Sequence, residues 1–303
     1  MLWKAIGVAA LAISVWLLST ELRNLSLDDV SARLVAMPPM TWILAGGATL
    51  GAYVLLGFYD RLALVYLGRR VNPFFVHVCA AATYAFAHLI GASVFSGAVI
   101  RYRAYSSKGL SPPEIATLVA FCAVTFCLGV VTVLGSVLVL QPFIVDRFLD
   151  TMPLDLTSGT GKLLIGAVIL YLVVALLPIR AVRLRSMTLV YPTPRIALLQ
   201  VVVASTEIIA AALVLYVALP APFNPGFVIV TGVFVLSFAA ALLSHAPGGL
   251  GVFELAFLTG LSDVPETDVL AALLVFRLYY FIFPFIFSVV VIAVFELRNR
   301  GAD

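Results

Sequence analysis

Charged side chains are scarce in this chain of 303 residues. Asp, Glu, Lys and Arg make up 11% of it and hydrophobic residues 63%, whereas a water-soluble domain of this size carries about a quarter charged residues. No polar stretch is long enough to form a separate soluble domain. The formal net charge of +3 does not favour a nucleic-acid partner. These absences predict a single membrane domain covering residues 1–303.

The chain also lacks the spacings typical of metal and catalytic chemistry. Cys79, Cys122 and Cys127 lie in apolar segments, and no CxxC pair or Cys/His zinc spacing is present. We therefore interpret all three as buried packing residues. There is no HExxH, no GxSxG, no pair of aspartates within the apolar segments and no nucleotide-binding motif. The sequence predicts a protein that is not an enzyme and holds neither a cofactor nor a metal.

Apolar runs long enough to cross about 30 Å of hydrocarbon recur along the chain. Two of them are too long for one span, and glycines interrupt both, at Gly91 and Gly97 in the first and around Gly248 in the second. We expect an all-α polytopic bundle of six spans plus two broken or re-entrant hairpins. Its eight apolar elements are residues 3–20, 41–66, 73–106, 114–140, 161–178, 196–218, 226–260 and 268–295.

The distribution of Lys and Arg predicts the orientation of the bundle. If each long element leaves the membrane on the side where it enters, 13 of the 18 cationic residues face the cytoplasm, 4 face outward and Arg277 lies in the membrane. This arrangement puts both termini in the cytoplasm. The inner group is Lys4, Arg61, Arg69, Arg70, Arg101, Arg103, Lys108, Arg180, Arg183, Arg185, Arg195, Arg298 and Arg300; the outer group is Arg23, Arg33, Arg147 and Lys162.

The eight elements repeat in order, with an offset of about 155 residues. Each half has three spans and one hairpin, so an odd number of crossings turns the second half upside down, as in many transporters. We expect inverted repeats covering approximately residues 1–150 and 155–303. The chain entering the last span of each half is similar too, and Ser111 with Glu114, and Asp263 with Glu266, are predicted N-terminal capping pairs.

Residues 244–254 interrupt the second long element with glycines and two ionisable side chains. Gly248, Gly249 and Gly251 would let backbone N–H groups approach an anion closely, with His245 and Glu254 beside them. Irregular backbone at membrane depth is tolerated only where protein or water covers it. The segment therefore predicts a central site for a lipid phosphate; a plain tight turn is the alternative.

Two further charges, Glu207 and Arg277, fall inside apolar elements, where an unpaired charge is costly. We expect Arg277 to pair with Glu254 or with Glu207. The pair either fixes helix packing, or Arg277 grips a phosphate with its planar guanidinium while a glutamate balances it. The sequence leaves both roles open.

Cations and tyrosines cluster in residues 97–110, with Arg101, Arg103, Tyr105 and Lys108 predicted at the cytoplasmic interface. They indicate either ordinary snorkelling in an aromatic belt or a surface that gathers anionic headgroups. His88, like His77, is interpreted as a packing residue.

Three motifs carry a resemblance to a known family. RYRAYSSKGLSPPE within residues 97–114, PGGLGVFE at 247–254 and FRLYYFIFP at 276–284 resemble the membrane region of the bacterial lysylphosphatidylglycerol synthase/flippase family, the multiple peptide resistance factors. The resemblance implies a lipid flippase unit, or a stand-alone relative, in the inner membrane of a bacterium and without the cytosolic domain that aminoacylates phosphatidylglycerol. With it, Tyr280 joins the candidate headgroup residues.

The predicted function is movement of an anionic or aminoacylated phospholipid between leaflets, either passive or coupled to an ion. Two alternatives stay open: a secondary transporter of a small solute, and a membrane subunit that scaffolds a lipid-modifying enzyme. Phospholipids are the expected partners. The sequence leaves open a homo-oligomer or an enzyme partner.

Overall fold

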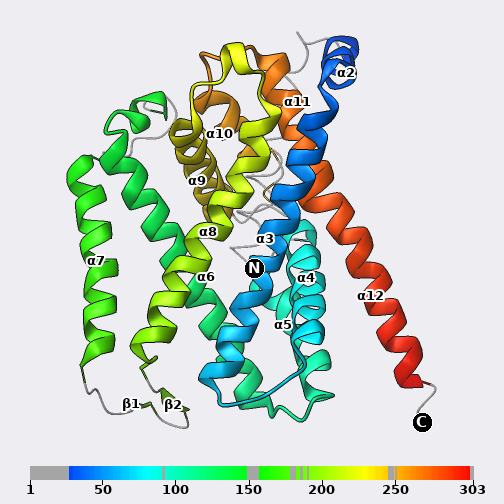
Figure 1. The fold of residues 1–303 in the computed structure, drawn as a ribbon, viewed down its shortest axis with the longest axis vertical. Helices are drawn as coiled ribbons and strands as arrows, with labels where there is room; N and C mark the ends of the chain where they lie inside the picture. Colours follow the sequence, from blue (N-terminus) through cyan, green and yellow to red (C-terminus); the bar gives the residue numbers. More distant parts are fainter. Residues whose placement is uncertain are drawn as a thin grey trace.

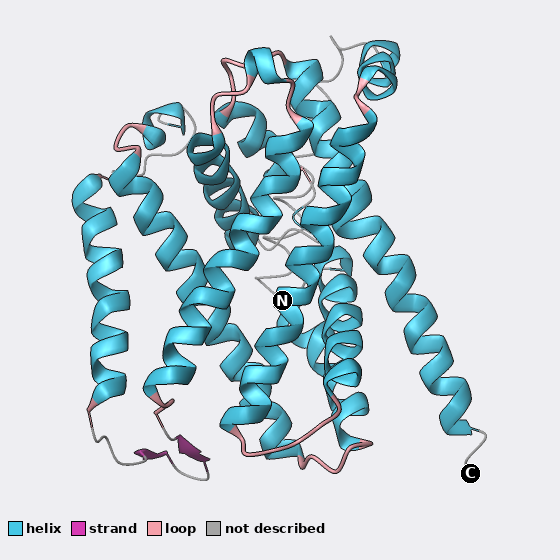
Figure 2. Cartoon of the chain, in the orientation of Figure 1, coloured by secondary structure: helices cyan, strands magenta, loops and turns pink. Residues whose placement is uncertain are grey.

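A computed structural model of the protein describes residues 27–90, 93–148, 157–177, 182–184, 187–189, 191–244, 249 and 251–300. The predicted span 3–20 lies outside the described residues, as do His245 and Gly248. The described chain is a bundle of helices with one small two-stranded sheet at one end (Figure 2). The predicted all-α class is confirmed.

The long helices run up and down the long axis of the molecule, and the two short strands lie side by side at one end (Figure 1). Pro39, Pro73, Pro112 and Pro194 each begin a helix, where their missing N–H costs nothing. The elements are α2 (Leu27–Ala36), α3 (Pro39–Tyr66), α4 (Pro73–Ile90), α5 (Ser93–Ser106), α6 (Pro112–Leu140), η1 (Ile144–Phe148), α7 (Ser158–Leu176), β1 (Val182–Leu184), β2 (Met187–Leu189), α8 (Pro194–Ala218), η2 (Ala221–Phe223), α9 (Phe227–Ser244), α10 (Val252–Gly260), α11 (Glu266–Phe276), η4 (Arg277–Ile282) and α12 (Phe283–Arg300).

Six helical segments of the described chain are long and apolar enough to cross a membrane. Because hydrocarbon offers no partner to a backbone N–H or C=O, each segment satisfies these groups within its own helix. The predicted count of eight apolar elements stays a prediction. The six segments are Pro39–Tyr66, Pro112–Leu140, Ser158–Leu176, Pro194–Ala218, Phe227–Ser244 and Glu266–Phe295.

The two long apolar elements of the sequence are each divided into two helices. The first forms α4 and α5, which pack against each other, and the second forms α9 and α10, which do the same. In Figure 1 the α4–α5 pair opens toward the end that carries the strands, and the α9–α10 pair toward the end that carries α2. The inverted relation of residues 1–150 to 155–303, which would produce such a pair, stays a prediction.

The two predicted capping pairs have different outcomes. At the start of α6, the Ser111 backbone N–H and hydroxyl both donate to Glu114 Oε2, at 2.8 and 2.7 Å, as expected. Asp263 does not cap α11, whose N-cap is Pro265. Asp263 instead accepts two hydrogen bonds from Arg147, at 2.8 and 3.0 Å. The capping prediction for Asp263 was wrong because its carboxylate forms a tertiary ion pair with Arg147 instead.

Close helix crossings hold the centre of the bundle together. α3 packs along α8, and α6 packs against both α7 and α8. At the α6–α8 crossing a Cβ added to Gly129 would lie 2.6 Å from the Cβ of Ala204. At the α6–α7 crossing a Cβ on Gly161 would lie 2.9 Å from the carbonyl oxygen of Gly135. Small residues therefore let the backbones touch, as is usual for helices packed in lipid.

Elements that carry basic residues lie at both ends of the described bundle. α2, which carries Arg33, lies at one end, whereas β1, which carries Arg183, and the last turns of α12 lie at the other (Figure 1). The assignment of the second end to the cytoplasm stays a prediction.

Candidate functional site

The Arg277 and Glu254 side chains form an ion pair inside the bundle. Arg277 Nε donates to Glu254 Oε1 at 2.6 Å, and a second guanidinium nitrogen contacts the same oxygen. The two side chains are 14% and 12% exposed, so they are largely but not fully enclosed. The guanidinium also lies over the Phe281 ring, 4.6 Å from its centroid. Of the two partners that the sequence left open for Arg277, the structure selects Glu254.

The backbone on both sides of this pair is irregular. Gly251 (φ +80°) precedes α10, and its N–H donates to Glu254 Oε2 at 2.8 Å. Gly249 also has a positive φ of +66°, a conformation that glycine adopts without steric cost. On the other side Arg277 begins the π-helix η4, a widened turn that often marks functional sites. The ion pair thus sits where two helical elements depart from regular geometry.

A third charged side chain, Glu207 of α8, lies next to the π-helix and is 4% exposed. Its carboxylate accepts hydrogen bonds from the Tyr280 hydroxyl at 2.7 Å and from the Tyr59 hydroxyl at 3.3 Å. The Tyr53 hydroxyl donates to the backbone carbonyl of Tyr280 at 2.9 Å. Because a π turn disturbs the regular hydrogen-bond ladder, this tyrosine supplies a partner from α3. Tyr280 therefore links the ion pair's helix to Glu207.

His88 packs against the same tyrosine. Its ring is stacked on that of Tyr280, with centroids 5.5 Å apart and an interplanar angle of 20°. His77, on the same helix, binds the Pro73 carbonyl through Nδ1 at 2.9 Å and packs edge-on against Phe58. Both histidines are in contact with neighbouring helices, as their predicted packing role requires.

A second interior ion pair joins Asp60 of α3 to Arg101 of α5. Arg101 donates to the two carboxylate oxygens at 2.7 and 3.1 Å, and the side chains are 6% and 0% exposed. The Tyr105 hydroxyl donates to Asp60 at 2.8 Å and the Cys122 thiol at 3.4 Å. The Tyr84 ring covers the guanidinium, with its centroid 4.7 Å away. Every polar atom of the carboxylate is therefore satisfied inside the protein.

This pair corrects the predicted headgroup surface in residues 97–110. Arg101 and Tyr105 point into the bundle, because Asp60 offers both of them a buried anion. Arg103 and Lys108 are exposed, and the Lys108 ammonium lies 4.6 Å from the centroid of the Phe75 ring. Only these two of the four predicted residues are on the surface.

The cysteine prediction also needs a correction. Cys79 and Cys122 are buried as expected, but Cys127 is exposed on α6. The two cysteines of α6 are about 1.4 turns apart, so Cys122 faces Asp60 whereas Cys127 faces outward. The described residues hold no group of three or more His, Cys, Asp or Glu side chains that could bind a metal ion.

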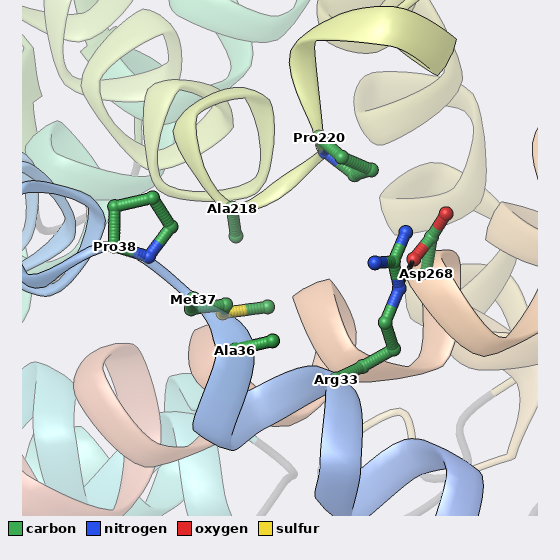
Figure 3. A pocket seen from close by; sticks show the side chains of 7 residues that line it. All are labelled: Arg33, Ala36, Met37, Pro38, Ala218, Pro220 and Asp268. Carbon is green, nitrogen blue, oxygen red and sulfur yellow. Dashed lines mark hydrogen bonds and ion pairs between the residues drawn. The ribbon is translucent and has the colours of Figure 1, made fainter.

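A cavity of about 70 Å³ lies apart from the site, between α2 and the η2 end of α8 (Figure 3). Arg33 and Asp268 form an ion pair on its wall, and Met37, Pro38, Ala218 and Pro220 give it an apolar lining. The pair ties α2 to α11. The sequence analysis placed Arg33 only among the outward-facing cations and did not identify Asp268 as its partner. Asp268 falls at the start of a predicted span, where a charge at the interface is ordinary.

The fold and the site together define a polytopic helical membrane protein with charged side chains in its interior, one pair of which, Glu254 and Arg277, lies at a broken and a widened helix. Such breaks are where transporters place their substrate sites. The chain belongs to the family described as the lysylphosphatidylglycerol synthase TM region, which it matches over residues 5–288.

Three relatives illustrate the range of this family. The uncharacterised protein slr0712 of Synechocystis sp. is 30% identical over 304 residues, covering 99% of this chain and 93% of its own length. The inner membrane protein YbhN of Escherichia coli is 28% identical over 262 residues, covering 84% and 80%. The phosphatidylglycerol lysyltransferase of Staphylococcus haemolyticus is 27% identical over 269 residues, covering 86% of this chain but only 30% of that enzyme.

Proposed function

We propose that this protein moves a phospholipid with an anionic or aminoacylated headgroup between the leaflets of a bacterial inner membrane, without changing its covalent structure. Membership of the family supports a role with membrane lipids. The names of two relatives supply the location and the lipids to test: an inner membrane protein, and an enzyme that acts on phosphatidylglycerol. The match to less than a third of that enzyme's length gives no support to lysyl transfer by this chain.

The observation that carries the proposal is the Arg277–Glu254 pair at the irregular backbone. A guanidinium matches the geometry of a phosphate diester, to which it donates two parallel hydrogen bonds. The carboxylate that Arg277 releases is then free to bind an ammonium group, and an aminoacylated phospholipid carries both charges. Such a headgroup would replace an internal ion pair by two new ones, so no charge is left uncompensated in the bundle.

Two cationic residues at the surface support a route for lipid headgroups toward the interior site. Arg103 and Lys108 are exposed at the end of α5 and in the following turn, where clustered cations attract anionic lipid. We assign them to gathering headgroups, whereas Arg101 and Tyr105 hold Asp60 and take no part. Tyr280 and Glu207 complete the interior site beside Arg277. His245 and Gly248 keep their predicted roles only as predictions, because they lie outside the described residues.

The test is lipid translocation by the purified protein in liposomes that contain labelled phosphatidylglycerol or its lysyl derivative. The variants are Arg277→Lys, Arg277→Gln, Glu254→Gln and the double variant Arg277→Gln/Glu254→Gln, compared at matched folded yield. We expect Arg277→Lys to lower the rate at least about tenfold, since a point charge cannot reproduce two aligned charged hydrogen bonds. The double variant should be no better than Arg277→Gln alone.

Recovery of transport in the double variant would contradict the phosphate role and leave Arg277 as a structural charge. Transport of a soluble solute with no movement of lipid would favour the secondary transporter. Wild-type protein that moves neither, but restores activity to a co-purified lipid-modifying enzyme, would favour the scaffold.

A further inference from the structure

Glu207 differs from the other two carboxylates in the middle of the bundle. Asp60 is paired with Arg101 and Glu254 with Arg277. Among the described residues no Lys or Arg nitrogen lies within 4 Å of the Glu207 carboxylate, whose hydrogen-bond donors are the hydroxyls of Tyr59 and Tyr280. Glu207 is nonetheless buried, with only 4% of its surface exposed, and it lies near the middle of α8.

A buried carboxylate without a cation can become neutral by taking up a proton, and burial favours that neutral form. Protonation of Asp60 or Glu254 would instead leave a buried arginine charge uncompensated, which is strongly unfavourable. The two tyrosine hydroxyls suit both forms of Glu207, because a hydroxyl either donates to a carboxylate or accepts from a carboxylic acid. The surroundings of Glu207 are thus able to hold it with or without a proton.

The position of Glu207 connects its charge to the headgroup site. Its shorter hydrogen bond comes from Tyr280, which lies three residues after Arg277 in the same π-helix. A charge-assisted hydrogen bond is about twice as strong as a neutral one. A change in the charge of Glu207 therefore changes how tightly the π turn is held to α8. That turn carries the guanidinium which would receive the lipid phosphate.

We propose that Glu207 binds the coupling ion of this transporter, and that the ion is a proton. The carboxylate takes one proton from the water on one side of the membrane and returns it to the other side, in step with the movement of one lipid. This inference rests on the proposed lipid transport. Sodium is a poorer fit, because a cation site needs several oxygen ligands, whereas Glu207 is held by two hydroxyl donors.

The other ionisable groups on the elements that pack against α8 either contact a partner or lie at the surface. α9 carries no ionisable residue. The contacts of those on the π-helix and on the other helices that pack against α8 include Arg277 with Glu254, Asp60 with Arg101, Cys122 with Asp60, Glu114 with Arg69, Asp268 with Arg33 and Tyr171 with Gln200. The Tyr53 hydroxyl donates to the backbone carbonyl of Tyr280, and the hydroxyls of Tyr59 and Tyr280 donate to Glu207 itself. Arg61 lies over the Phe58 ring, and Lys162 is exposed near the start of α7.

The experiment imposes a pH gradient of about one unit on proteoliposomes that contain labelled lysylphosphatidylglycerol, with the membrane potential clamped at zero. One proton per lipid predicts a steady-state lipid ratio between the leaflets of about ten to one, because one pH unit is a tenfold difference in proton activity. Glu207→Gln should reduce this ratio to one. Glu207→Asp keeps a titratable carboxyl and should retain a response. Glu266→Gln, which removes an exposed carboxylate of α11, is the matched control and should behave as wild type.

A second measurement does not depend on transport. Infrared difference spectra of the purified wild-type protein, recorded from mildly acidic to mildly alkaline pH, should contain the band of a buried carboxylic acid, and Glu207→Asp should shift this band.

The outcomes separate the two proposals. Wild-type protein that moves no lipid under any condition overturns the proposed function, and the coupling with it. Lipid that equilibrates to a ratio of one despite the gradient, or a Glu207→Gln variant that still concentrates lipid, overturns the coupling and leaves lipid transport standing. A sodium gradient that drives transport where the pH gradient does not, or spectra without a pH-sensitive carboxylic acid, also rules out the proton.

Discussion

The two interior ion pairs of this protein are chemically alike and structurally different. Asp60 and Arg101 lie on regular helices, with a tyrosine, a thiol and an aromatic ring around them and almost no exposure. Glu254 and Arg277 lie beside a positive-φ glycine and a π-helix, and both are slightly exposed. We therefore propose that the enclosed pair holds helices together and that the pair at the irregular backbone is the one that opens. The comparison teaches that depth and charge alone do not identify a binding site.

The largest expected effect comes from removing one partner of the enclosed pair. Asp60→Asn leaves the Arg101 charge buried without compensation, so it should lower the free energy of unfolding by about 3–5 kcal/mol. Glu254→Gln should cost less, about 1–3 kcal/mol, because the second pair is less completely enclosed, with side chains 14% and 12% exposed. Denaturant unfolding in detergent measures both.

The matched control is the double variant Asp60→Asn/Arg101→Leu, which removes the stranded charge and should recover much of the lost stability. If Glu254→Gln proves the more destabilising change, or if the double variant is no better than Asp60→Asn, the proposed contrast between the two pairs is wrong.

A substitution with a smaller expected effect tests whether the backbone beside the Glu254–Arg277 pair is held in its irregular conformation. Gly251→Ala places a Cβ on a residue with φ +80° and should cost about 1–2 kcal/mol. Gly47→Ala is the control, because Gly47 lies within α3 with no atom within 4 Å of an added Cβ. That change should stabilise the protein by up to about 1 kcal/mol. Equal effects at the two positions would show that Gly251 is not held in its left-handed conformation.

The smallest effect concerns an ion pair near the surface, which serves as a reference for the two interior pairs. The hydrogen bonds from Arg147 hold the pKa of the Asp263 carboxyl below its ordinary value. The stability that this lowered pKa provides is present above the unfolded-state pKa of about 3.9 and is lost as the pH falls through the lower, folded-state value. Asp263 is half-exposed, so we expect less than about 1 kcal/mol.

The measurement is the thermal unfolding midpoint as a function of pH for the wild type and for Asp263→Asn. The two curves should differ at neutral pH and converge in acid. Curves that stay parallel into acid would contradict the linkage to this carboxyl.

Much of the architecture was predictable because hydrocarbon is a demanding solvent. Apolar run lengths identified the spans from 41 onward, and the glycines within 73–106 and 226–260 marked the division of both long elements into two helices. The sequence also singled out Arg277 and Glu254, since charges inside apolar runs are costly and need a partner. It did not indicate the π-helix, because residues 277–282 have no residue pattern that distinguishes a widened turn from an ordinary one.

Asp60 was missed for a different reason. It stands beside Arg61, near the end of its span, where charges ordinarily face water or lipid headgroups. The one indication in the sequence was its position on the helix, which places Asp60 on the inward face and Arg61 on the outward face. Without a known partner that signal was weak, and the cations of residues 97–110 were all placed on the surface as a consequence.

The sequence by itself determined that this chain is a helical membrane protein with charges in its interior, because an apolar run of sufficient length must satisfy its backbone hydrogen bonds within a helix. Only the tertiary structure decided which charged side chains pair. Arg101 pairs with Asp60, 41 positions away in the sequence, and Arg277 pairs with Glu254, 23 positions away. Glu207 accepts hydrogen bonds from two tyrosines, 148 and 73 positions away. Whether two charged side chains pair in a medium of low dielectric depends on the distance between them to within about an ångström. Helix packing sets that distance, and no local sequence pattern records it.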